Sequence, residues 1–422
     1  QSGERHGLPP DVSAAAAGMI EVTYEQLAGA GLNLSNVPAS RIAVTLKGEP
    51  VVRHVAGASE AAPGQPLFGP GASVRFWADL PEVPDALYVN HYSFRIADDP
   101  ANALPADLQI NEFTGFVDSF EPEPPPGSAI VGSYTARQTR EDDLAYHFAS
   151  PLVDPWYTAH LRAGRNDTHV ATFNLDSASL IQQSGALRVR IAGLTDFPQA
   201  PDHRVLVDLN GQTLGEKVFE GQSVVDLDLD VPAGLLQAGP NLVRVVAPGG
   251  TQAPADIQLL DRIDLLHTRR LEAVNGRLLV EQRLPAPNQA LVASGFGPGP
   301  VAAYARLDGR LIVLESERDP AGTVSVPSFE RQADYWISSA GAIHSATDIR
   351  GVPDADLLAG SPDLNFVVIA HPTFMPLSTE ELHPLNDFVE ARQAEGWNIG
   401  LFDVSAIQQQ YGWGMPLPEA VN

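Results

Sequence analysis

Apolar and polar residues alternate in short segments through the middle of this chain. Ala186–Gly193 and Arg204–Leu209 alternate, and Val224–Val231 alternates from Val225 onward with aspartates on the polar side. Asn210-Gly211 directly follows the second segment, and Asn-Gly favours a tight hairpin because both turn positions need positive φ. Short strands separated by turns at regular spacing predict a β-sandwich of jelly-roll type.

Strand-like segments also occur on both sides of this region. We expect strands over 20–24, 41–46, 49–55 and 73–80 before it, and over 278–284, 300–315 and 333–339 after it. We divide the chain into five regions: a flexible arm over 1–18; an N-terminal β domain over 19–145, with a Pro-rich loop at 98–127; a sandwich over 146–272; a small β domain over 273–352; and the start of an α/β domain over 353–422.

The last sixty residues follow a different pattern. Leu364–Ala370 is an almost wholly apolar run, which is typical of a strand covered on both faces. Ser378–Glu381 fits a capping box, apolar residues at helical spacing follow, and Gly396 suits a left-handed C-cap. Asn398–Val404 predicts a second strand. Because two parallel strands are not a stable domain, we expect the native protein to extend beyond Asn422, or a second fragment to complete this sheet.

Composition narrows the classes of function. The chain carries 26 Lys and Arg against 52 Asp and Glu, a net charge of −26, and 36 Gly and 36 Pro. Nucleic acid and anionic membranes both bind basic surfaces, so neither is an expected partner. The sequence has no run of eighteen apolar residues, so it predicts no membrane-spanning helix. The acidic, Gly- and Pro-rich composition fits a mainly β protein outside the cell.

The chain contains no cysteine. Disulfides, thiol nucleophiles and cysteine metal sites are therefore excluded within these residues. No serine is singled out as a nucleophile, since no nucleophile elbow is present, and no zinc-binding helix motif occurs. We assign no catalytic residue and no cofactor. A structural calcium ion stays an unassigned alternative.

Two polar residues fall where predicted parallel strands end. His371 follows the first apolar run, and Asp403 closes the second. Ligands of open α/β sheets bind outside the carboxyl ends of strands, so His371 and Asp403 are candidates for the edge of a site. The simpler interpretation is that His371 shapes a turn and Asp403 binds loop amides, and we favour it.

Acidic and aromatic residues suggest two further kinds of site. Asp226, Asp228 and Asp230 are carboxylates of the kind that bind calcium, but alternation spaces them along a strand, so we predict a solvated sandwich face. The aromatic residues could stack on sugar rings, although aromatic residues in small β domains more often pack in the core. The candidates for stacking are Trp77, Tyr88, Tyr92, Trp156 and Tyr157.

The N-terminal and C-terminal motifs resemble those of the gingipain-like cysteine peptidases. The N-terminal matches are Ile20–Tyr24 with Leu27 and Gly31-Leu32, then Pro38–Arg41 with Gly48–Pro50, and Gly71–Phe76. The sandwich matches are Val207–Gly211, Phe219–Gly221 and Gly239–Asn241. The most specific matches lie at the end: Phe366–Phe374, Asp403-Val404, Ile407, Tyr411–Gly414 and Pro418–Ala420.

The resemblance implies β modules followed by a caspase-like α/β core with a His–Cys dyad. In such enzymes the thiolate attacks a peptide carbonyl and imidazole moves the proton. The family's dyad lies downstream of the matched residues, His371 matches a strand-end motif instead, and this chain has no cysteine. The resemblance therefore implies that this chain alone is inactive.

The sequence thus supports one interpretation and one alternative. We predict the non-catalytic N-terminal portion of a secreted gingipain-like peptidase, supporting an α/β domain that a downstream segment completes. The alternative is an inactive extracellular or cell-surface structural or adhesion protein that forms polymers or binds glycans.

Overall fold

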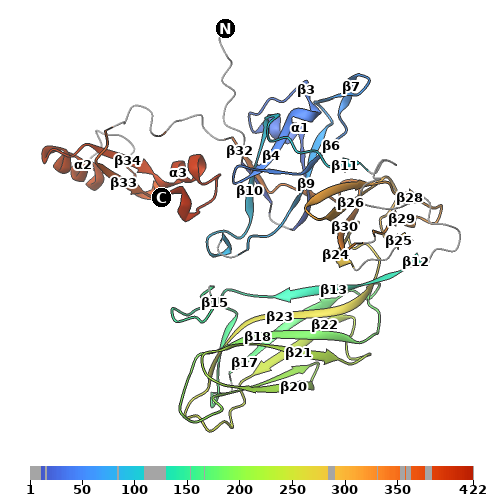
Figure 1. Ribbon diagram of the computed structural model, residues 1–422, viewed down its shortest axis with the longest axis vertical. Helices are drawn as coiled ribbons and strands as arrows, with labels where there is room; N and C mark the ends of the chain where they lie inside the picture. The colour runs from blue at the N-terminus through green and yellow to red at the C-terminus, as the bar shows by residue number, and fades with distance from the viewer. Residues whose placement is uncertain are drawn as a thin grey trace. The chain divides into compact units, whose positions relative to one another are not determined.

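The computed structural model describes residues 11–14, 17–82, 85–108, 130–152, 154–165, 167–283, 290–329, 331–351, 357, 363–375 and 383–421 (Figure 1). The chain divides into two compact units. The first comprises residues 1–108, 309–313 and 343–422, and the second comprises 109–308 and 314–342. Strands dominate both units, which confirms the mainly β prediction.

The first unit begins with small, mostly antiparallel sheets. One sheet has the order β32-β1-β10-β4-β5, a second β31-β2-β9-β6, and a third β3-β8-β7. Their strands are β1 (Asp11–Ala14), β2 (Gly18–Thr23), β3 (Val37–Pro38), β4 (Ile42–Leu46), β5 (Glu49–Val51), β6 (Arg53–Ala56), β7 (Ser59–Ala62), β8 (Gln65–Phe68), β9 (Ser73–Ala78), β10 (Tyr92–Asp98), β31 (His344–Ser345) and β32 (Asp348–Arg350).

Two features of these sheets differ from the sequence-based expectations. Asp11–Ala14 was expected in a flexible arm, but it pairs with β10 on one side and with β32 on the other. Residues 344–350 return to this unit and supply edge strands, although they were expected to close the small β domain. Both differences are long-range strand pairings, which a local alternation pattern does not specify.

A helix cap fixes the first turn of the chain after β2. Thr23 accepts the backbone N–H of Gln26 and the Gln26 side chain accepts the N–H of Thr23, so a capping box starts α1 (Tyr24–Gly29). Leu27 of this helix is buried in a core with Ile20, Phe68 and Phe76. The short helices η1 (Ala39–Arg41) and η2 (Asp85–Leu87) complete the connections.

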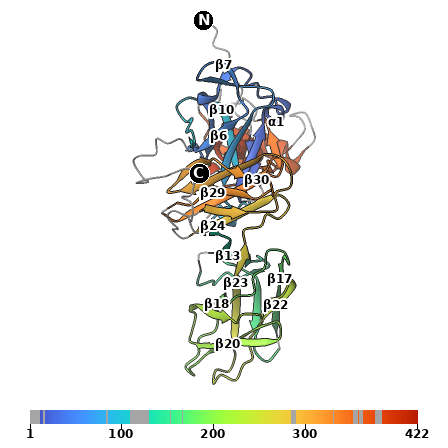
Figure 2. The same cartoon turned by 90° about the vertical axis from the view of Figure 1, so that its right-hand side faces the viewer.

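The second unit contains a two-layered β-sandwich, seen from two directions in Figures 1 and 2. One sheet has the order β13-β23-β18-β21, with β16 also paired to β23, and the other has the order β17-β22-β19-β20. The strands are β13 (Ser133–Arg140), β16 (Ala159–Arg162), β17 (Thr168–Leu175), β18 (Gly185–Gly193), β19 (His203–Leu209), β20 (Gln212–Phe219), β21 (Val224–Val231), β22 (Gly239–Val246) and β23 (Ile257–Arg270).

Alternation determines which side chains fill the sandwich. Val189, Val207 and Val243, which come from three strands, all lie in one core of fully buried side chains. Asn210 and Gly211 have φ values of 52° and 82°, which confirms the predicted hairpin turn between β19 and β20.

Residues after the sandwich form further short sheets. β24 (Arg277–Arg283), β30 (Ala333–Ser339) and β26 (Val301–Leu307) are neighbours in one sheet. A second sheet is formed by β12 (Ile130–Val131), β25 (Ala290–Ala293), β29 (Val324–Pro327) and β28 (Glu317–Arg318). β27 (Arg310–Leu314) pairs with β11 (Asp107–Leu108). Most of the Pro-rich loop over 98–127 lies outside the described residues.

The C-terminal segment contains the predicted parallel pair. β33 (Phe366–Ala370) pairs with β34 (Ile399–Asp403), and between them lie η3 (Pro372–Phe374) and α2 (Pro384–Ala394). α3 (Val404–Tyr411) and η4 (Pro418–Ala420) follow. α2 begins at Pro384, with His383 as its N-cap, while the predicted capping box at 378–381 lies outside the described residues. Gly396 has the predicted positive φ of 96°.

Candidate functional site

The ends of β33 and β34 bring the two predicted site-edge residues to one edge. Ala370 is opposite Asp403 in the parallel register, and His371 directly follows Ala370. His371 Nδ1 accepts the backbone N–H of Thr373 over 3.2 Å, and Asp403 Oδ1 accepts that of Ser405 over 2.7 Å. Each side chain therefore caps the short helix after it, as the simpler interpretation requires.

The side chains of this parallel strand pair are more exposed than those of a typical buried parallel sheet. Val367 and Ile369 of β33 are 54% and 39% exposed. Phe366 contacts Phe388 of α2 and Trp397, with ring centroids 6.1 Å and 5.7 Å apart. All residues of α2 are at least partly exposed. An apolar, β-branched strand normally packs on both faces, so this sheet has apolar surface still to bury.

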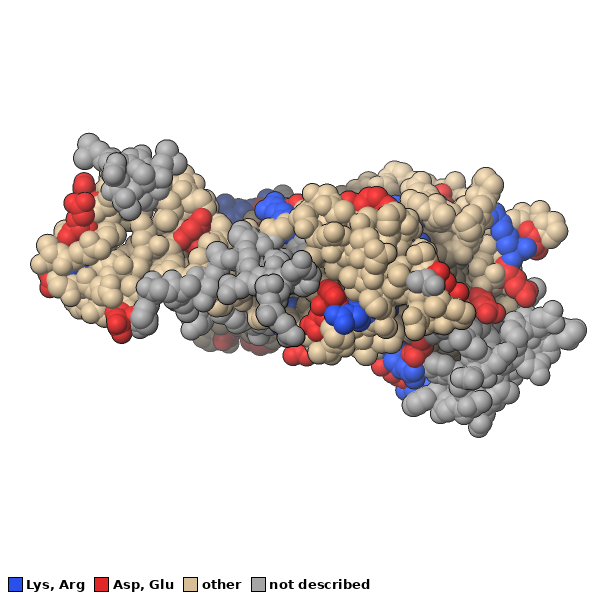
Figure 3. Space-filling model, turned by 90° about the horizontal axis from the view of Figure 1, so that it is seen from above, with Lys and Arg blue, Asp and Glu red and all other residues tan. Residues whose placement is uncertain are grey.

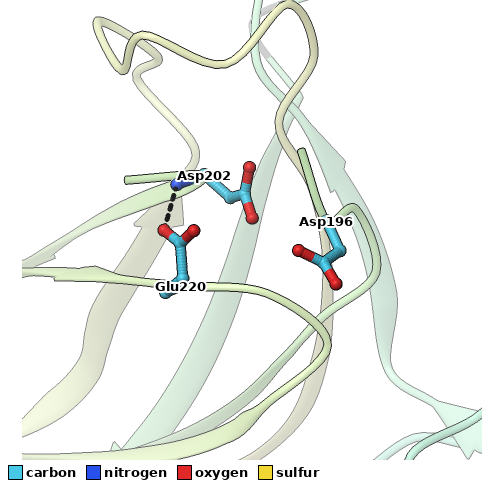
Figure 4. A group of neighbouring side chains, drawn as sticks. All are labelled: Asp196, Asp202 and Glu220. Atoms are coloured by element: carbon cyan, nitrogen blue, oxygen red, sulfur yellow. Dashed lines mark hydrogen bonds between the residues drawn. The ribbon is translucent and has the colours of Figure 1, made fainter. Parts of the chain in front are cut away.

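Three carboxylates converge at one end of the sandwich (Figure 4). Asp196 follows β18, Asp202 precedes β19 and Glu220 follows β20, and one ligand oxygen from each lies within 4.8 Å of the others. Asp202 is fully buried, and its two oxygens accept the backbone N–H groups of Phe197 and Gly221 over 3.1 and 3.0 Å. Among the described residues, these three carboxylates are the group of His, Asp and Glu side chains whose ligand atoms lie close enough together to hold a metal ion.

The chemistry of this group suits a hard cation such as Ca²⁺, which prefers carboxylate oxygens. However, Asp202 also donates its own N–H to Glu220 Oε2 over 3.1 Å. The hydrogen bonds of Asp202 alone explain its burial, because they join the loops on either side. We therefore treat the group as a structural junction and assign no ion to it. Sequence reasoning missed it, because no spacing motif links the three residues.

A second polar network lies beside this junction. The Nδ1 atom of buried His203 is 2.8 Å from Asp256 Oδ1, and Gln258 Nε2 donates to the same carboxylate. Burial lowers the pKa of His203, but the hydrogen bond and charge of Asp256 outweigh it, and the net pKa is raised. A Cβ on Gly193 would lie 2.5 Å from His203 Nε2, so glycine is required there. The network holds the strand ends together in the sandwich interior.

The aspartates of β21 lie on a solvated face, as predicted. Arg190 binds Asp226 and Arg188 binds Asp228 across the β18–β21 pair, while Asp230 is exposed. The three side chains do not converge on one point, and two are neutralised by arginines. This arrangement stabilises the sheet surface and offers no cation site.

A cavity of about 660 Å³ lies in the second unit over the face of β13, β23 and β18. Charged side chains line it, but they form pairs, such as Arg137 with Asp264 and Arg306 with Asp334. Because these charges are already compensated, the cavity does not concentrate one sign of charge for a ligand.

The five aromatic candidates for sugar stacking do not form one surface. Trp77 and Tyr157 are buried in the core, as the favoured interpretation expected, and Tyr92 is only partly exposed. Tyr88 and Trp156 are exposed but belong to different units. Tyr146, whose ring lies 5.2 Å from that of Trp156, and the nearby Phe148 are also exposed, and sequence reasoning selected neither. The signal for both was the alternation of apolar residues over Leu144–Phe148.

On the face drawn in Figure 3, basic side chains of the described residues are few and lie apart or next to acidic ones. Among the described residues, no helix is long and apolar enough to cross a membrane.

These features define a mainly β chain of two compact units, in which residues 363–421 form a parallel α/β segment. Its fold is similar to that of dimeric latent PorU from Porphyromonas gingivalis, with a TM-score of 0.61 and 14% identity. The similarity covers 98% of this chain and 39% of the PorU chain, so this chain spans well under half the length of that protein. At this identity the comparison establishes a similar fold only.

Other solved structures match only part of the chain. The CBM36-1 domain of a multidomain xylanase from the hindgut metagenome of Trinervitermes trinervoides matches 31% of this chain and 96% of its own, with 15% identity and a TM-score of 0.23. A carbohydrate-binding module CBM36 in complex with calcium and xylotriose matches 33% and 93%, with 16% identity and a TM-score of 0.20. These scores are too low to support an inference. No family model and no curated protein sequence matches the chain.

Proposed function

We propose that this chain is the non-catalytic N-terminal portion of a secreted gingipain-like cysteine peptidase. Its β modules support an α/β domain that residues 363–421 begin and that a downstream segment or a second fragment completes. The fold similarity to PorU and the motifs that resemble the gingipain-like family extend over most of the same residues, which supports this relationship.

The carrying observation is the exposed parallel pair. β33 and β34 pair with each other and with no further described strand, while Val367 and Ile369 are 54% and 39% exposed. A parallel sheet is stable only when helices or further strands cover it. A segment that adds strands beside this pair would bury these side chains.

Within the first unit, the N-terminal sheets contact the other end of the α/β segment. Ile407, Met415 and Leu417 are buried, Met415 Sδ accepts the N–H of Ser93 in β10, and Arg95 of β10 donates to the Gln409 carbonyl. The N-terminal sheets thus hold α3 and the residues after it. A β domain with this contact would fix the position of the α/β sheet, which is the supporting role we propose.

This portion would leave the chemistry to other residues. A His–Cys dyad cannot form within a chain that lacks cysteine. His371 and Asp403 would lie at the carboxyl edge of the completed sheet, where they are candidates for shaping the site rather than for proton transfer.

The test is to read the gene beyond residue 422 and to measure the intact mass of the natural protein. We expect a continuing reading frame that encodes further apolar strand segments followed by a histidine and a cysteine, and a polypeptide or bound fragment well above 45.0 kDa. A stop codon directly after Asn422 would contradict the proposal. It would favour the alternative of an inactive extracellular structural or adhesion protein.

A further inference from the structure

A short hairpin on the second unit presents large apolar side chains to solvent. β14 (Ala145–Tyr146) pairs with β15 (Trp156–Tyr157). Leu144, Tyr146, Phe148 and Trp156 are 77%, 55%, 84% and 37% exposed. Four exposed large apolar side chains on one short hairpin mark an interaction surface. We call Tyr146, Phe148 and Trp156 the aromatic group.

The opposite side of the hairpin is firmly anchored. Tyr157 is buried with Ala192 and Leu259 of the sandwich. Its hydroxyl lies 2.5 Å from Ser150 Oγ, and Ser150 Oγ is also 3.0 Å from the carbonyl of Asp154. The hairpin is therefore held in place from beneath, and the exposure of the aromatic group does not come from a loose loop.

The rings of the aromatic group are not coplanar. Tyr146 and Trp156 meet edge to face, with centroids 5.2 Å apart and planes at 62°. Phe148 stacks on His147 at 5.4 Å and 15°, and so belongs to a separate pair. A flat sugar chain stacks best on rings that share one plane. Rings set at different angles offer separate faces, which suits individual cationic side chains.

Carboxylates flank both strands of the hairpin. Glu141, Asp142 and Asp143 lie just before Leu144 and β14, Asp154 lies just before Pro155 and β15, and Asp261 belongs to β23. Burial raises the pKa of Asp143, and the charges of Asp154 and Asp142 raise it further. These groups therefore repel one another, and a positive ligand would relieve that repulsion.

Nearby cations neutralise this charge only in part. Arg262 lies 3.8 Å from Glu141 but also 3.3 Å from Asp264, and Arg190 binds Asp226. Two histidines complete the surroundings, since the rings of His147 and His160 are 6.0 Å apart. The pKa of His160 is lowered, mainly by burial, which favours its neutral form. The region around the hairpin thus combines exposed rings with excess negative charge.

We propose that the β14–β15 hairpin binds a basic polypeptide segment, whose Lys or Arg side chains lie against the aromatic group and pair with Asp143 and Asp154. Cation–π contact and charge pairing act together at such a surface, and charge complementarity also steers the encounter. This surface lies in the second unit and does not depend on the proposed function.

The experiment titrates the whole chain with a labelled peptide of alternating arginine and glycine, followed by fluorescence anisotropy at two salt concentrations. Phe148→Ala should weaken binding by about fivefold or more, since an exposed or partly desolvated cation–π contact is worth about 1 kcal/mol. Asp143→Asn should also weaken binding and reduce its dependence on salt. Phe148 is so exposed that its substitution should leave the fold intact, which the thermal midpoint checks.

Matched controls separate a specific surface from the general attraction of an acidic protein. Asp230→Asn removes one negative charge from β21 opposite Ala186, whereas the hairpin packs on Ala192 at the other end of β18. Val170→Ala shortens an exposed apolar residue outside the hairpin. Neither should change affinity. Equal weakening by Asp143→Asn and Asp230→Asn would overturn the proposal. Binding of xylohexaose in place of the peptide, or loss of self-association as the main effect of Phe148→Ala, would overturn it as well.

Discussion

Arg190 and Asp226 face each other directly across the β18–β21 pair. The guanidinium binds the carboxylate through two contacts, Nε to Oδ1 over 2.9 Å and Nη2 to Oδ2 over 3.1 Å. This hydrogen bond lowers the pKa of Asp226, and burial opposes it only in part. A strand of alternating valine, leucine and aspartate thus becomes stable by pairing its polar side with arginines of the next strand.

Asp226→Asn should destabilise the sandwich slightly, by about 0 to 1 kcal/mol, because both partners are partly exposed. A lowered carboxyl pKa stabilises the fold above the unfolded pKa of about 3.9. That contribution is lost as the pH falls through the folded pKa. The difference between variant and native protein should therefore be present at pH 7 and disappear in acid. Native-state hydrogen exchange of β18 amides would measure it, and a difference that grows in acid would contradict this account.

Asp202→Ala should destabilise the sandwich by about 2 to 4 kcal/mol. The substitution removes the acceptor for the backbone N–H groups of Phe197 and Gly221, and a buried donor without a partner costs about 1 to 3 kcal/mol. The measurement is the free energy of exchange for amides of β19 and β20.

Glu220→Gln is the matched control for the carboxylate junction. The amide oxygen can still accept the N–H of Asp202, so the expected change in stability is below about 1 kcal/mol. If Glu220→Gln costs as much as Asp202→Ala, the negative charge of the group matters more than the hydrogen bonds of Asp202, and the structural interpretation is wrong.

Asp261 should make the sandwich less stable as the pH rises. Burial raises its pKa from 3.8 to about 6, only partly opposed by Arg262 and Arg190. For a raised carboxyl pKa, stability is full below the unfolded pKa and is lost as the pH rises through the folded pKa. The shift corresponds to about 3 kcal/mol at most, with water access reducing it.

Asp261→Asn should therefore stabilise the sandwich at pH 8 and have little effect at pH 3.5. The measurement is the free energy of unfolding of the variant and the native protein at the two pH values, from chemical denaturation and from hydrogen exchange of β23 amides. Asp230→Asn provides the control, since the side chain of Asp230 is exposed. A gain of equal size at both pH values would show that shape rather than charge explains the effect.

Local patterns predicted the sandwich well because its strands follow simple rules. Val224–Val231 forms β21 with the bounds that alternation indicates, and Asn210 and Gly211 adopt the expected turn. The start of α2 was predicted less well. His383 and Pro384 begin this helix, and an imidazole cap with proline in the first turn is a weaker sequence signal than a capping box.

The candidate sites depended on contacts that no local pattern specifies. Asp196, Asp202 and Glu220 meet only because three strands end at the same place. The burial of Tyr157 and exposure of Trp156, its neighbour, follow from which side of β15 faces the sandwich. Alternation places them on opposite sides, but only the fold decides which side is inside.

The exposed parallel pair gives the most direct test of whether this sheet is complete in the chain alone. Ile369→Ala should cost only about 1 kcal/mol, because the side chain is already 39% exposed and has less buried surface to lose than a core residue. Ile96→Ala, a fully buried site in the same unit, should cost about 2 to 5 kcal/mol. In a protein extended as we propose, Ile369→Ala should become as costly as Ile96→Ala, since added strands would bury it. A cost that stays small in the extended protein would show that the downstream segment does not pack on β33.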